Sequence, residues 1–352
     1  MKKFAVLVAG GTGGHINAAL AVGEALTEKK FDVLYLTGKR LLDYKLFKDH
    51  NVIHLDSKPL RTKNPIRLIR NILENLISFI RIFFFFMNKR PRFIIGAGGY
   101  VCGPTLLAGF LQGIPVYIIE QNAVMGLTNK ILGWFSRKIF VHFSETKGLS
   151  PRLEKKVVTV GNPTRKSIRP VSKKIMDEKL NVLVFGGSLG AEQINRAIFK
   201  SLESSIASRL RIHHQVGPKY KLPEINTTAE YQALEYIDDM QREYEWCDVI
   251  ISRSGASTIS ELAIIKKPTL IFPYPQATDN HQYYNALIFK SESEFSVEIL
   301  DPNIETKQAA ESVNEFFSKA LNGNLEYSNI PHSGNKTCES ILREVFNDSG
   351  TY

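Results

Sequence analysis

Two glycine-rich segments of the chain have the residue types that bind phosphate groups. Residues 6–15 read VLVAGGTGGH, and residues 182–191 read VLVFGGSLGA. In each, a short apolar run that predicts a buried strand leads into glycines that precede a predicted helix. Glycines allow the backbone to turn tightly and to approach a ligand, and the N–H groups at the start of a helix attract anions. Glycines also make the turn in any strand–helix unit, but two matched loops favour two anion-binding sites.

The spacing of these glycines differs from that of a dinucleotide-binding site. The GxGxxG pattern requires a glycine three positions after its second glycine, and after Gly13 that position holds Ile16. Gly187 and Gly190 do not have the spacing either. An acidic residue that would hold a ribose is also absent from residues 37–39 (TGK), at the end of the second predicted strand. The sequence therefore argues against a dinucleotide-dependent oxidoreductase.

The elements that must position these loops alternate between strand and helix, as in parallel sheets with crossover helices. The alternation stops in a basic, proline-containing segment around residues 162–179 and then begins again. We therefore expect two doubly wound, Rossmann-like α/β domains. The expected strands are residues 4–9, 33–36, 52–55, 93–95, 116–119, 139–141 and 157–160 in the first domain, and 182–185, 212–216, 233–237, 249–252, 270–272 and 296–299 in the second.

The composition is that of a folded protein in a reducing compartment. The chain has 352 residues, of which 43% are apolar, and this length favours two domains. Cys102, Cys247 and Cys338 are odd in number and have no CxxC spacing, which argues against a disulfide framework and a structural zinc site. The apolar run at residues 4–9 ends too early for a signal peptide. No run reaches the ~18 consecutive apolar residues that a spanning helix needs.

The excess basic charge gathers in one segment. The formal net charge is +10, and between Lys58 and Arg92 nine Lys and Arg residues stand against one acidic residue, Glu74. Within this segment, residues 64–89 are apolar at helical spacing, which predicts an amphipathic helix. Its core-facing side is expected to carry Ile66, Ile69, Leu73, Leu76, Ile77, Ile80, Phe83, Phe84 and Met87.

Further apolar side chains extend the surface of this helix toward its basic stripe, which is more than one buried face requires. A basic helix with surplus apolar surface is typical of proteins that bind an anionic membrane surface. Arg81 and Glu74 argue against a membrane span, and without a nucleic-acid-binding module the charge does not indicate a nucleic-acid partner. We therefore predict membrane contact through Arg67, Arg70, Ile77, Ile80, Arg81, Phe85 and Phe86.

Seven segments, in order, resemble the MurG family of bacterial N-acetylglucosaminyltransferases. They are residues 10–15 (GGTGGH), 98–104 (GGYVCGP), 120–122 (EQN), 126–130 (GLTNK), 160–163 (VGNP), 186–188 (GGS) and 252–256 (SRSGA). The ordered set is far more specific than any single motif. Two places depart from the family: residues 16–19 (INAA) lack its usual proline, and His281 replaces a more common glutamine or similar residue.

The resemblance implies a glycosyltransferase-B architecture, in which two Rossmann-like domains face each other across a cleft. Residues 1–163 would form an acceptor-binding and membrane-associating domain and residues 164–336 a UDP-sugar-binding domain, with a helix at about 337–346 packed back on the first. The implied reaction is inverting transfer of GlcNAc from UDP-GlcNAc to the 4-hydroxyl of MurNAc in undecaprenyl-diphospho-MurNAc-pentapeptide. This step converts lipid I to lipid II in peptidoglycan synthesis. The resemblance also implies a peripheral enzyme at the cytoplasmic face of the plasma membrane that uses no cofactor.

The resemblance also implies which residues bind the substrates. UDP leaves with its diphosphate, and helix starts at Ser188 and Ala256 would offer N–H donors to that charge without a metal. Glu261 would hold the ribose hydroxyls, the backbone of Ile237 the uracil, and Gln282 the sugar. The full set of substrate-binding residues is Thr12, Gly13, Gly14, Tyr100, Asn122, Arg165, Ser188, Ile237, Ala256, Ser257, Thr258, Glu261 and Gln282.

His15 is the predicted general base, with Glu120 as the alternative. A neutral imidazole accepts a hydroxyl proton near pH 7, and a helix N-terminus disfavours the imidazolium form. The simpler role for His15 is to cap the helix or to position the acceptor phosphate. Metal-dependent transfer is disfavoured because no Asp-x-Asp follows a strand, and Asp238-Asp239 more simply caps a helix.

Other functions remain compatible with the same fold. A diacylglycerol glycosyltransferase or a UDP-GlcNAc 2-epimerase would share the nucleotide-binding half and differ in the first domain, at the Tyr100 and Glu120 segments. A non-catalytic sugar-nucleotide sensor would keep the second domain but would not need His15.

Overall fold

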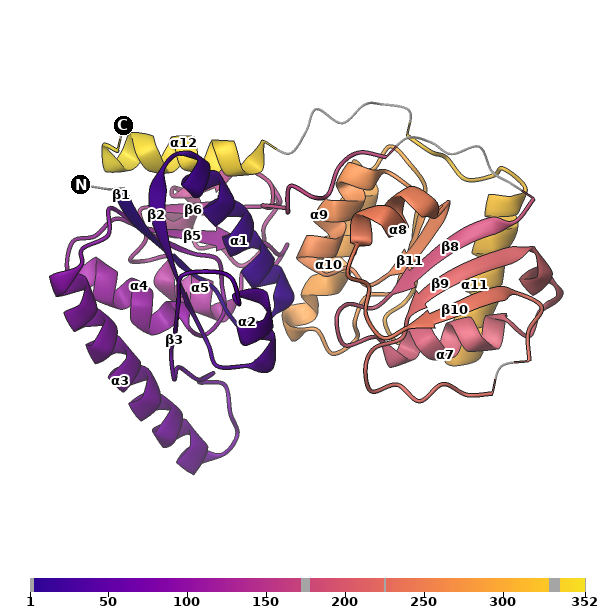
Figure 1. The fold of residues 1–352 in the computed structure, drawn as a ribbon, viewed down its shortest axis with the longest axis horizontal. Helices are drawn as coiled ribbons and strands as arrows, with labels where there is room; N and C mark the ends of the chain where they lie inside the picture. The colour runs from indigo at the N-terminus through magenta and orange to yellow at the C-terminus, as the bar shows by residue number, and fades with distance from the viewer. Residues whose placement is uncertain (1–2, 172–177, 225, 329–335, 352) are drawn as a thin grey trace. The chain divides into compact units, whose positions relative to one another are not determined.

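The computed structural model describes residues 3–171, 178–224, 226–328 and 336–351. The chain divides into two compact units, Met1–Arg165 with Asn335–Tyr352, and Lys166–Gly334. Each unit contains one parallel sheet flanked by helices (Figure 1). The division falls after Arg165, close to the boundary after residue 163 that the sequence predicts.

The first unit is built on a seven-stranded sheet in the order β3-β2-β1-β4-β5-β6-β7. Its strands are β1 (Lys3–Val8), β2 (Phe31–Thr37), β3 (Val52–His54), β4 (Ile94–Gly96), β5 (Val116–Glu120), β6 (Lys138–Val141) and β7 (Val157–Thr159). Its helices are α1 (Gly13–Glu28), α2 (Leu41–Leu46), α3 (Pro65–Asn88), α4 (Cys102–Leu111), α5 (Leu127–Leu132), α6 (Pro151–Glu154) and α12 (Thr337–Ser349). The central strands are apolar throughout because both faces of the sheet are covered.

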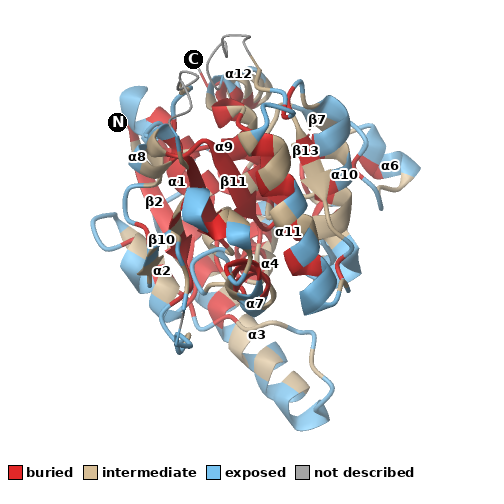
Figure 2. Ribbon diagram, turned by 90° about the vertical axis from the view of Figure 1, so that its right-hand side faces the viewer, coloured by how far each residue is buried: buried red, intermediate tan, exposed pale blue. Residues whose placement is uncertain are grey.

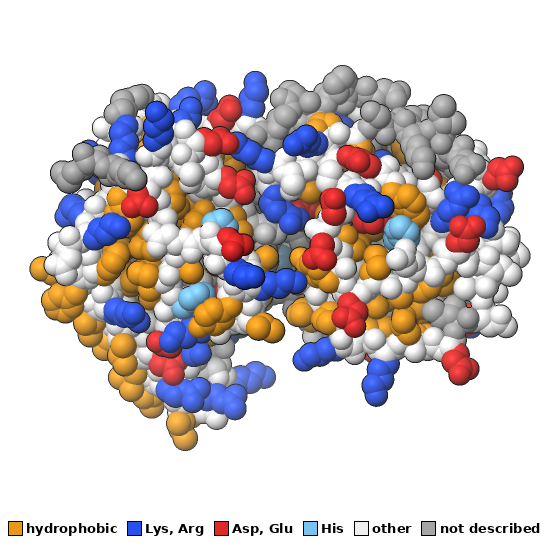
Figure 3. All heavy atoms as spheres, viewed as in Figure 1, with side chains coloured by type: hydrophobic (Ala, Val, Ile, Leu, Met, Phe, Trp, Pro, Cys, Tyr) orange, Lys and Arg blue, Asp and Glu red, His pale blue; other side chains and the backbone are white. Residues whose placement is uncertain are grey.

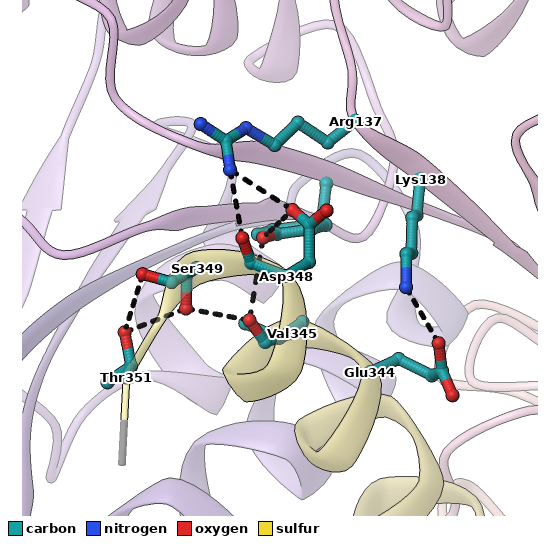
Figure 4. A network of polar contacts seen from close by, with 8 residues as sticks. Arg137, Lys138, Glu344, Val345, Asp348, Ser349 and Thr351 are labelled. Carbon is teal, nitrogen blue, oxygen red and sulfur yellow. Dashed lines mark hydrogen bonds and ion pairs between the residues drawn. The ribbon is translucent and has the colours of Figure 1, made fainter.

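The helix α12 belongs to the core of the first unit although the chain reaches it after the whole second unit. The ring of Phe346 stacks on Phe31 at 5.4 Å between centroids. Figure 4 shows polar contacts of this helix: Nη1 of Arg137 lies 3.3 Å from the carboxylate of Asp348, and Nζ of Lys138 lies 2.7 Å from that of Glu344. The hydroxyl of Tyr117 also donates to Asp348 at 2.6 Å. Apolar packing and partly exposed polar contacts together fix α12 to the sheet.

The helix α3 faces the core with the side opposite to the one predicted. Its buried residues are Ser78, Ile82 and Phe86, whereas Ile69 and Ile77, expected in the core, are 61% and 63% exposed. Figure 2 shows exposed and intermediate residues along most of this helix, and Figure 3 shows hydrophobic side chains along its open edge at the lower left. The membrane contact predicted at Phe86 is therefore wrong, because this side chain is fully buried, and Phe85 is half-buried against the core.

The reversal has a physical cause in the polar residues of α3. Asn71 and Asn75 lie toward the protein, where their amide groups donate to the carbonyl oxygens of Pro59 and Lys58 at 2.7 and 2.8 Å. An amphipathic pattern would place these two polar side chains on the solvent side of the helix. They can face the protein because the two carbonyl oxygens satisfy their amide groups. The exposed apolar residues of α3, here called the outer face, are Ile66, Ile69, Ile72, Leu73, Leu76, Ile77, Ile80, Phe84 and Met87. Across the described residues, no helix combines the length and apolar character of a membrane span.

The second unit is built on a six-stranded sheet in the order β10-β9-β8-β11-β12-β13. Its strands are β8 (Leu180–Phe185), β9 (Leu210–Gln215), β10 (Glu230–Leu234), β11 (Val249–Ser252), β12 (Thr269–Ile271) and β13 (Val297–Ile299). Its helices are α7 (Glu192–Ser201), α8 (Met240–Trp246), α9 (Ala256–Ile265), α10 (His281–Glu292) and α11 (Thr306–Leu321), with short 3-10 turns η1 (Ser205–Arg209) and η2 (Thr278–Asn280).

A neutral histidine is built into the core of this second sheet. His214 on β9 is fully buried; its Nε2 lies 3.0 Å from Oδ1 of Asn195, and the hydroxyl of Tyr231 lies 2.9 Å from its Nδ1. The amide oxygen can only accept, so Nε2 carries the proton and Nδ1 accepts from Tyr231. Burial lowers the pKa of His214 from 6.5 to about 3.

We predict that His214 makes folding sensitive to acid. Its pKa is lower in the folded than in the unfolded state, so below pH 6.5 the unfolded state binds the extra proton. Its contribution to stability is complete above that pH and is lost as the pH falls toward the folded pKa of about 3. Between pH 7 and about pH 4.5 the loss through this group should be about 2.5 kcal/mol. Urea denaturation should show a smaller loss for His214→Asn than for the wild type; equal losses would contradict the prediction.

Candidate active site

In the first unit, glycines and polar residues gather where the strand order reverses. The sheet continues in opposite directions from the adjacent strands β1 and β4. In open parallel sheets, ligands bind beyond the carboxyl ends of the strands at such a switch point. The loops that follow β1 and β4 meet there, because the N–H of Gly10 donates to the carbonyl oxygen of Gly98 at 3.3 Å.

His15 is held in this switch region at the start of α1. Thr12 caps the helix, and its side chain accepts from the N–H of His15 at 3.4 Å. The Nδ1 atom of His15 lies 3.3 Å from the carbonyl oxygen of Gly10. A carbonyl can only accept, so Nδ1 carries the proton and the ring lone pair is on Nε2. Gly98, at φ +111°, lies against the ring, since a Cβ there would come within 2.7 Å of it.

Tyr100 lies over the glycine loop that follows β1, and the side chain of Arg40 packs on its ring. Its ring is 3.5 Å from the place a Cβ on Gly11 would take. The guanidinium of Arg40 stacks over the ring at 5.1 Å, and its Nη1 donates to the carbonyl oxygen of Gly11 at 2.8 Å. Burial raises the pKa of the Tyr100 phenol. Sequence reasoning missed Arg40, which is an ordinary surface residue until the fold brings it to this loop.

Glu120 organises the next loop. Its carboxylate is 3% exposed and accepts from the N–H of Asn122 and of Gly126 at 3.0 and 2.9 Å. The side-chain amides of Asn122 and Asn129 donate to it as well, at 3.3 and 2.9 Å. A carboxylate engaged by the protein's own donors is suited to hold Asn122 at the edge of the sheet. These contacts favour His15 over Glu120 as the base.

The predicted donor residues of the second unit also gather at a switch point, between β8 and β11. Ser188 follows β8, and residues 256–258 and Glu261 follow β11. The helix predicted to start at Ser188 begins four residues later, at Glu192. Gly190, at φ +75°, lies against the carbonyl oxygen of Val216, which a Cβ would approach within 2.0 Å. This close packing extends the loop past Ser188, so Ser188 lies in an exposed loop and not at a helix start.

The start of α9 offers donors to an anion. The helix begins at Ala256, after Gly255 at its N-cap position, so the first-turn N–H groups come from Ala256, Ser257 and Thr258. The Oγ of Ser257 is buried and has no hydrogen-bond partner. Backbone donors and a hydroxyl at a helix N-terminus are suited to a phosphate group.

The predicted uracil contact, Ile237, lies after β10. This strand ends at Leu234, three residues before the predicted end, because its pairing with β9 ends where Leu234 meets Gln215. The amide of Gln215, which is 4% exposed, accepts from the N–H of Ile237 at 2.9 Å and donates to the carbonyl oxygen of Gly187 at 2.7 Å. Gln215, which sequence reasoning missed, ties the predicted uracil contact to the glycine loop.

Gln282 and Arg253 hold the loop after β12. Gln282 on α10 accepts from the N–H of Tyr274 at 3.0 Å. Arg253 is buried, its Nη1 donates to the carbonyl oxygens of Phe272 and Pro273 at 3.0 Å, and burial lowers its pKa to about 10. Arg253 is therefore not a surface charge; its guanidinium fixes the loop after β12.

Two remaining predictions concern Arg165 and metals. Arg165 falls in the first unit by its contacts, and its predicted contact with the leaving diphosphate stays a prediction. Asp239 caps α8 by accepting from the N–H of Arg242 at 3.1 Å, which confirms the capping role expected for Asp238-Asp239 at the second of the two residues. Among the described residues, no group of three or more His, Cys, Asp and Glu side chains is arranged to hold a metal ion.

Known protein families and individual relatives match this chain over most of its length. Residues 5–141 match the glycosyltransferase family 28 N-terminal domain, and residues 181–340 match the family 28 C-terminal domain. The chain is 35% identical over 295 residues to the UDP-N-acetylglucosamine–N-acetylmuramyl-(pentapeptide) pyrophosphoryl-undecaprenol N-acetylglucosamine transferase of Myxococcus xanthus, covering 80% of this chain and 76% of that protein. It is 33% identical to the transferase of the same name from Sulfurihydrogenibium sp., covering 99% and 100%.

Solved structures show the same fold. The crystal structure of Acinetobacter baumannii MurG is similar with a TM-score of 0.72 and 25% identity, covering 98% of this chain and 99% of that one. The UDP-GlcNAc 2-epimerase of Neisseria meningitidis, bound to UDP-GlcNAc, is similar with a TM-score of 0.64 at 14% identity, covering 98% and 100%, which shows the fold alone.

Two switch-point sites on two parallel sheets, together with both family 28 domains, make this chain a glycosyltransferase of the glycosyltransferase-B architecture. Its relatives narrow the class further. The chain belongs to the MurG family and is an N-acetylglucosaminyltransferase that uses UDP-GlcNAc and a lipid-linked acceptor.

Proposed function

We propose that His15 is the general base in transfer of GlcNAc from UDP-GlcNAc to the 4-hydroxyl of MurNAc in undecaprenyl-diphospho-MurNAc-pentapeptide. The reaction is that of the family to which the chain belongs. The observation that carries the residue assignment is the contact of His15 Nδ1 with the Gly10 carbonyl oxygen at 3.3 Å, which puts the lone pair on Nε2 at the switch point of the first sheet.

In this proposal, Nε2 of His15 takes the proton of the 4-hydroxyl as the oxygen attacks the anomeric carbon. The bond between that carbon and the diphosphate oxygen breaks on the opposite face of the sugar, so the anomeric centre inverts and UDP leaves. The partial positive charge at the start of α1 disfavours the imidazolium form, so the ring is present as the neutral imidazole that can accept a proton. Asn122, held by Glu120, and Tyr100 would position the acceptor.

The donor half of the proposal uses the second unit. The first turn of α9 and the exposed Ser188 loop would bind the diphosphate, where negative charge builds up as UDP leaves. Glu261 would hold the ribose hydroxyls, the backbone of Ile237 the uracil and Gln282 the sugar. The orphaned Oγ of Ser257 supports a ligand at this helix start.

The test is transfer from radiolabelled UDP-GlcNAc to a short-chain muramyl-diphospholipid that carries the pentapeptide. UDP-glucose as the donor and diacylglycerol as the acceptor are the controls. We expect one labelled disaccharide lipid that forms only with the muramyl acceptor. A product that forms only with diacylglycerol would contradict the acceptor assignment, and conversion of UDP-GlcNAc to its 2-epimer would contradict the reaction type.

We further propose that the outer face of α3 binds the anionic cytoplasmic surface of the plasma membrane as a peripheral contact. The outer face is exposed and apolar, and the side chains of Arg67, Arg70 and Arg81 on the same helix are exposed as well. Apolar side chains would enter the interface while the guanidinium groups pair with lipid phosphates. A lipid-linked acceptor lies in that same interface, so the contact would bring the first unit to its substrate.

Charge reversal tests the electrostatic part of this proposal. Each basic side chain near an anionic surface contributes about 1 kcal/mol, so changing Arg67, Arg70 and Arg81 to Glu should weaken binding to vesicles with anionic lipid by at least about 100-fold. Co-sedimentation with such vesicles and with purely zwitterionic vesicles measures the effect. The control carries the same change at three exposed basic residues of the second unit, Arg196, Lys200 and Arg209. Equal loss in both variants, or none in the first, would contradict a site on α3.

A further inference from the structure

We propose that Tyr244 is a positioning residue that fixes the carboxylate of Glu261 for the ribose of the UDP-sugar. The inference rests on the proposed role of Glu261 and adds a second residue to it. Neither its position on α8 nor its spacing in the sequence indicates such a role.

The hydroxyl of Tyr244 donates to Oε2 of Glu261 at 2.9 Å. Tyr244 lies on α8 and Glu261 on α9, so the bond joins two helices on either side of β11 in the chain. The phenol ring is fully buried, and Glu261 is 7% exposed. A hydrogen bond to a charged group at such burial is stronger than one at the surface, and it holds the carboxylate in one orientation.

Further contacts hold Tyr244 in place. Its ring packs against the ring of Phe185, the last residue of β8, with centroids 6.3 Å apart at 68°. Its carbonyl oxygen accepts from the buried Nζ of Lys267 at 2.7 Å. The phenol is therefore anchored to the strand that carries the glycine loop, and it transmits that fixed position to the carboxylate.

A fixed carboxylate matters for ribose because its two hydroxyls are neighbours on one ring. A carboxylate has about four acceptor sites, and holding two hydroxyls at once requires the plane of the group to be set. Tyr244 occupies one site and thereby sets the plane before the ligand arrives. Without the Tyr244 hydroxyl, Glu261 would have to be ordered when the ligand binds, which would lower the affinity for the ribose.

The chain offers a matched control at Tyr231. This tyrosine also lies in the second unit, and its hydroxyl also has a buried partner, Nδ1 of His214 at 2.9 Å. That partner is a core histidine of β9 with no proposed ligand contact. Tyr244→Phe and Tyr231→Phe each remove one hydroxyl and leave the ring, so both test folding while only the first tests positioning.

The experiment measures dissociation constants for UDP and for 2′,3′-dideoxy-UDP by calorimetry on the full chain, together with the melting temperature. We expect Tyr244→Phe to reduce the preference for UDP over the dideoxy analogue about fivefold to tenfold, the range of one buried hydrogen bond. Tyr231→Phe should lower the melting temperature and leave that preference unchanged. In a Glu261→Ala background, the Tyr244→Phe change should have no further effect on the preference.

The outcomes separate the inference from the function it rests on. If Glu261→Ala keeps the full preference for UDP, the proposed ribose role of Glu261 fails, and the inference with it. If Glu261→Ala abolishes the preference and Tyr244→Phe leaves it at the wild-type value, the inference alone is overturned. An equal effect of Tyr244→Phe with and without Glu261 would also overturn it, because Tyr244 would then act by another route.

Discussion

Replacing His15 by alanine should slow transfer by at least about 100-fold, because a positioned general base contributes about 10²- to 10⁴-fold. The loss should appear in kcat, with little change in the KM for UDP-GlcNAc, because the proposed donor contacts lie in the other unit. Steady-state transfer to the short-chain acceptor measures both constants.

His54 provides the control for this substitution. Its Nδ1 also contacts a glycine carbonyl oxygen in the first unit, that of Gly38 at 2.7 Å, but His54 is the last residue of the edge strand β3 and not part of the switch region. His54→Ala should retain transfer near the wild-type rate. Turnover of His15→Ala within a few-fold of the wild type would remove His15 as the base, and a drop confined to the KM for the acceptor would reduce it to a positioning role.

Replacing three outer-face side chains, Ile69, Ile77 and Phe84, by serine should lower the partition onto vesicles by about 1,000-fold. Each large apolar side chain that enters the interface contributes about 1.5 kcal/mol or more. Stability should change little, because the three side chains are already exposed in the folded protein. Vesicle flotation and thermal denaturation of the same samples measure the two quantities.

Ile82→Ser is the matched control on the same helix. Ile82 is 1% exposed and lies in the core of the first unit, so this variant should lose stability, and its folded fraction should keep the vesicle affinity of the wild type. Unchanged vesicle binding of the triple variant would rule out the outer face as the contact.

The strands were predictable from sequence because nearly all of them are buried on both faces. An apolar run of four to six residues followed by glycine, such as residues 182–187, has few other interpretations in an alternating chain. The edge strand β10 was placed three residues late, since Tyr231 and Ala233 are only half-buried and the apolar signal there is weak. Edge position therefore accounts for the error.

The orientation of α3 could not be predicted because both of its sides carry apolar residues. Periodicity marks an apolar stripe but does not say whether it meets the protein or another surface. The deciding groups were the carbonyl oxygens of Lys58 and Pro59, which bind Asn75 and Asn71. Only the folded loop before the helix brings those acceptors into place.

The candidate site residues could be named from the sequence where they stand in motifs next to glycines, and their roles stay predictions. Residues that support them are far away along the chain: Gln215 lies 28 positions from Gly187, and Tyr244 lies 17 positions from Glu261. Glutamine at a strand end and tyrosine inside a helix are ordinary core residues in a single sequence. Their roles follow from contacts that exist only after both strands and helices have packed.

The docking of α12 determines the order in which the protein can mature during synthesis. A ribosome makes residues 166–334 before it makes Phe346 and Asp348, which complete the core around Phe31 and Tyr117. The part of the chain translated first is thus completed last, and until then the ring of Phe31 lacks its stacking partner. A nascent chain stalled before residue 337 should carry a finished second unit and a first unit whose apolar core is still open.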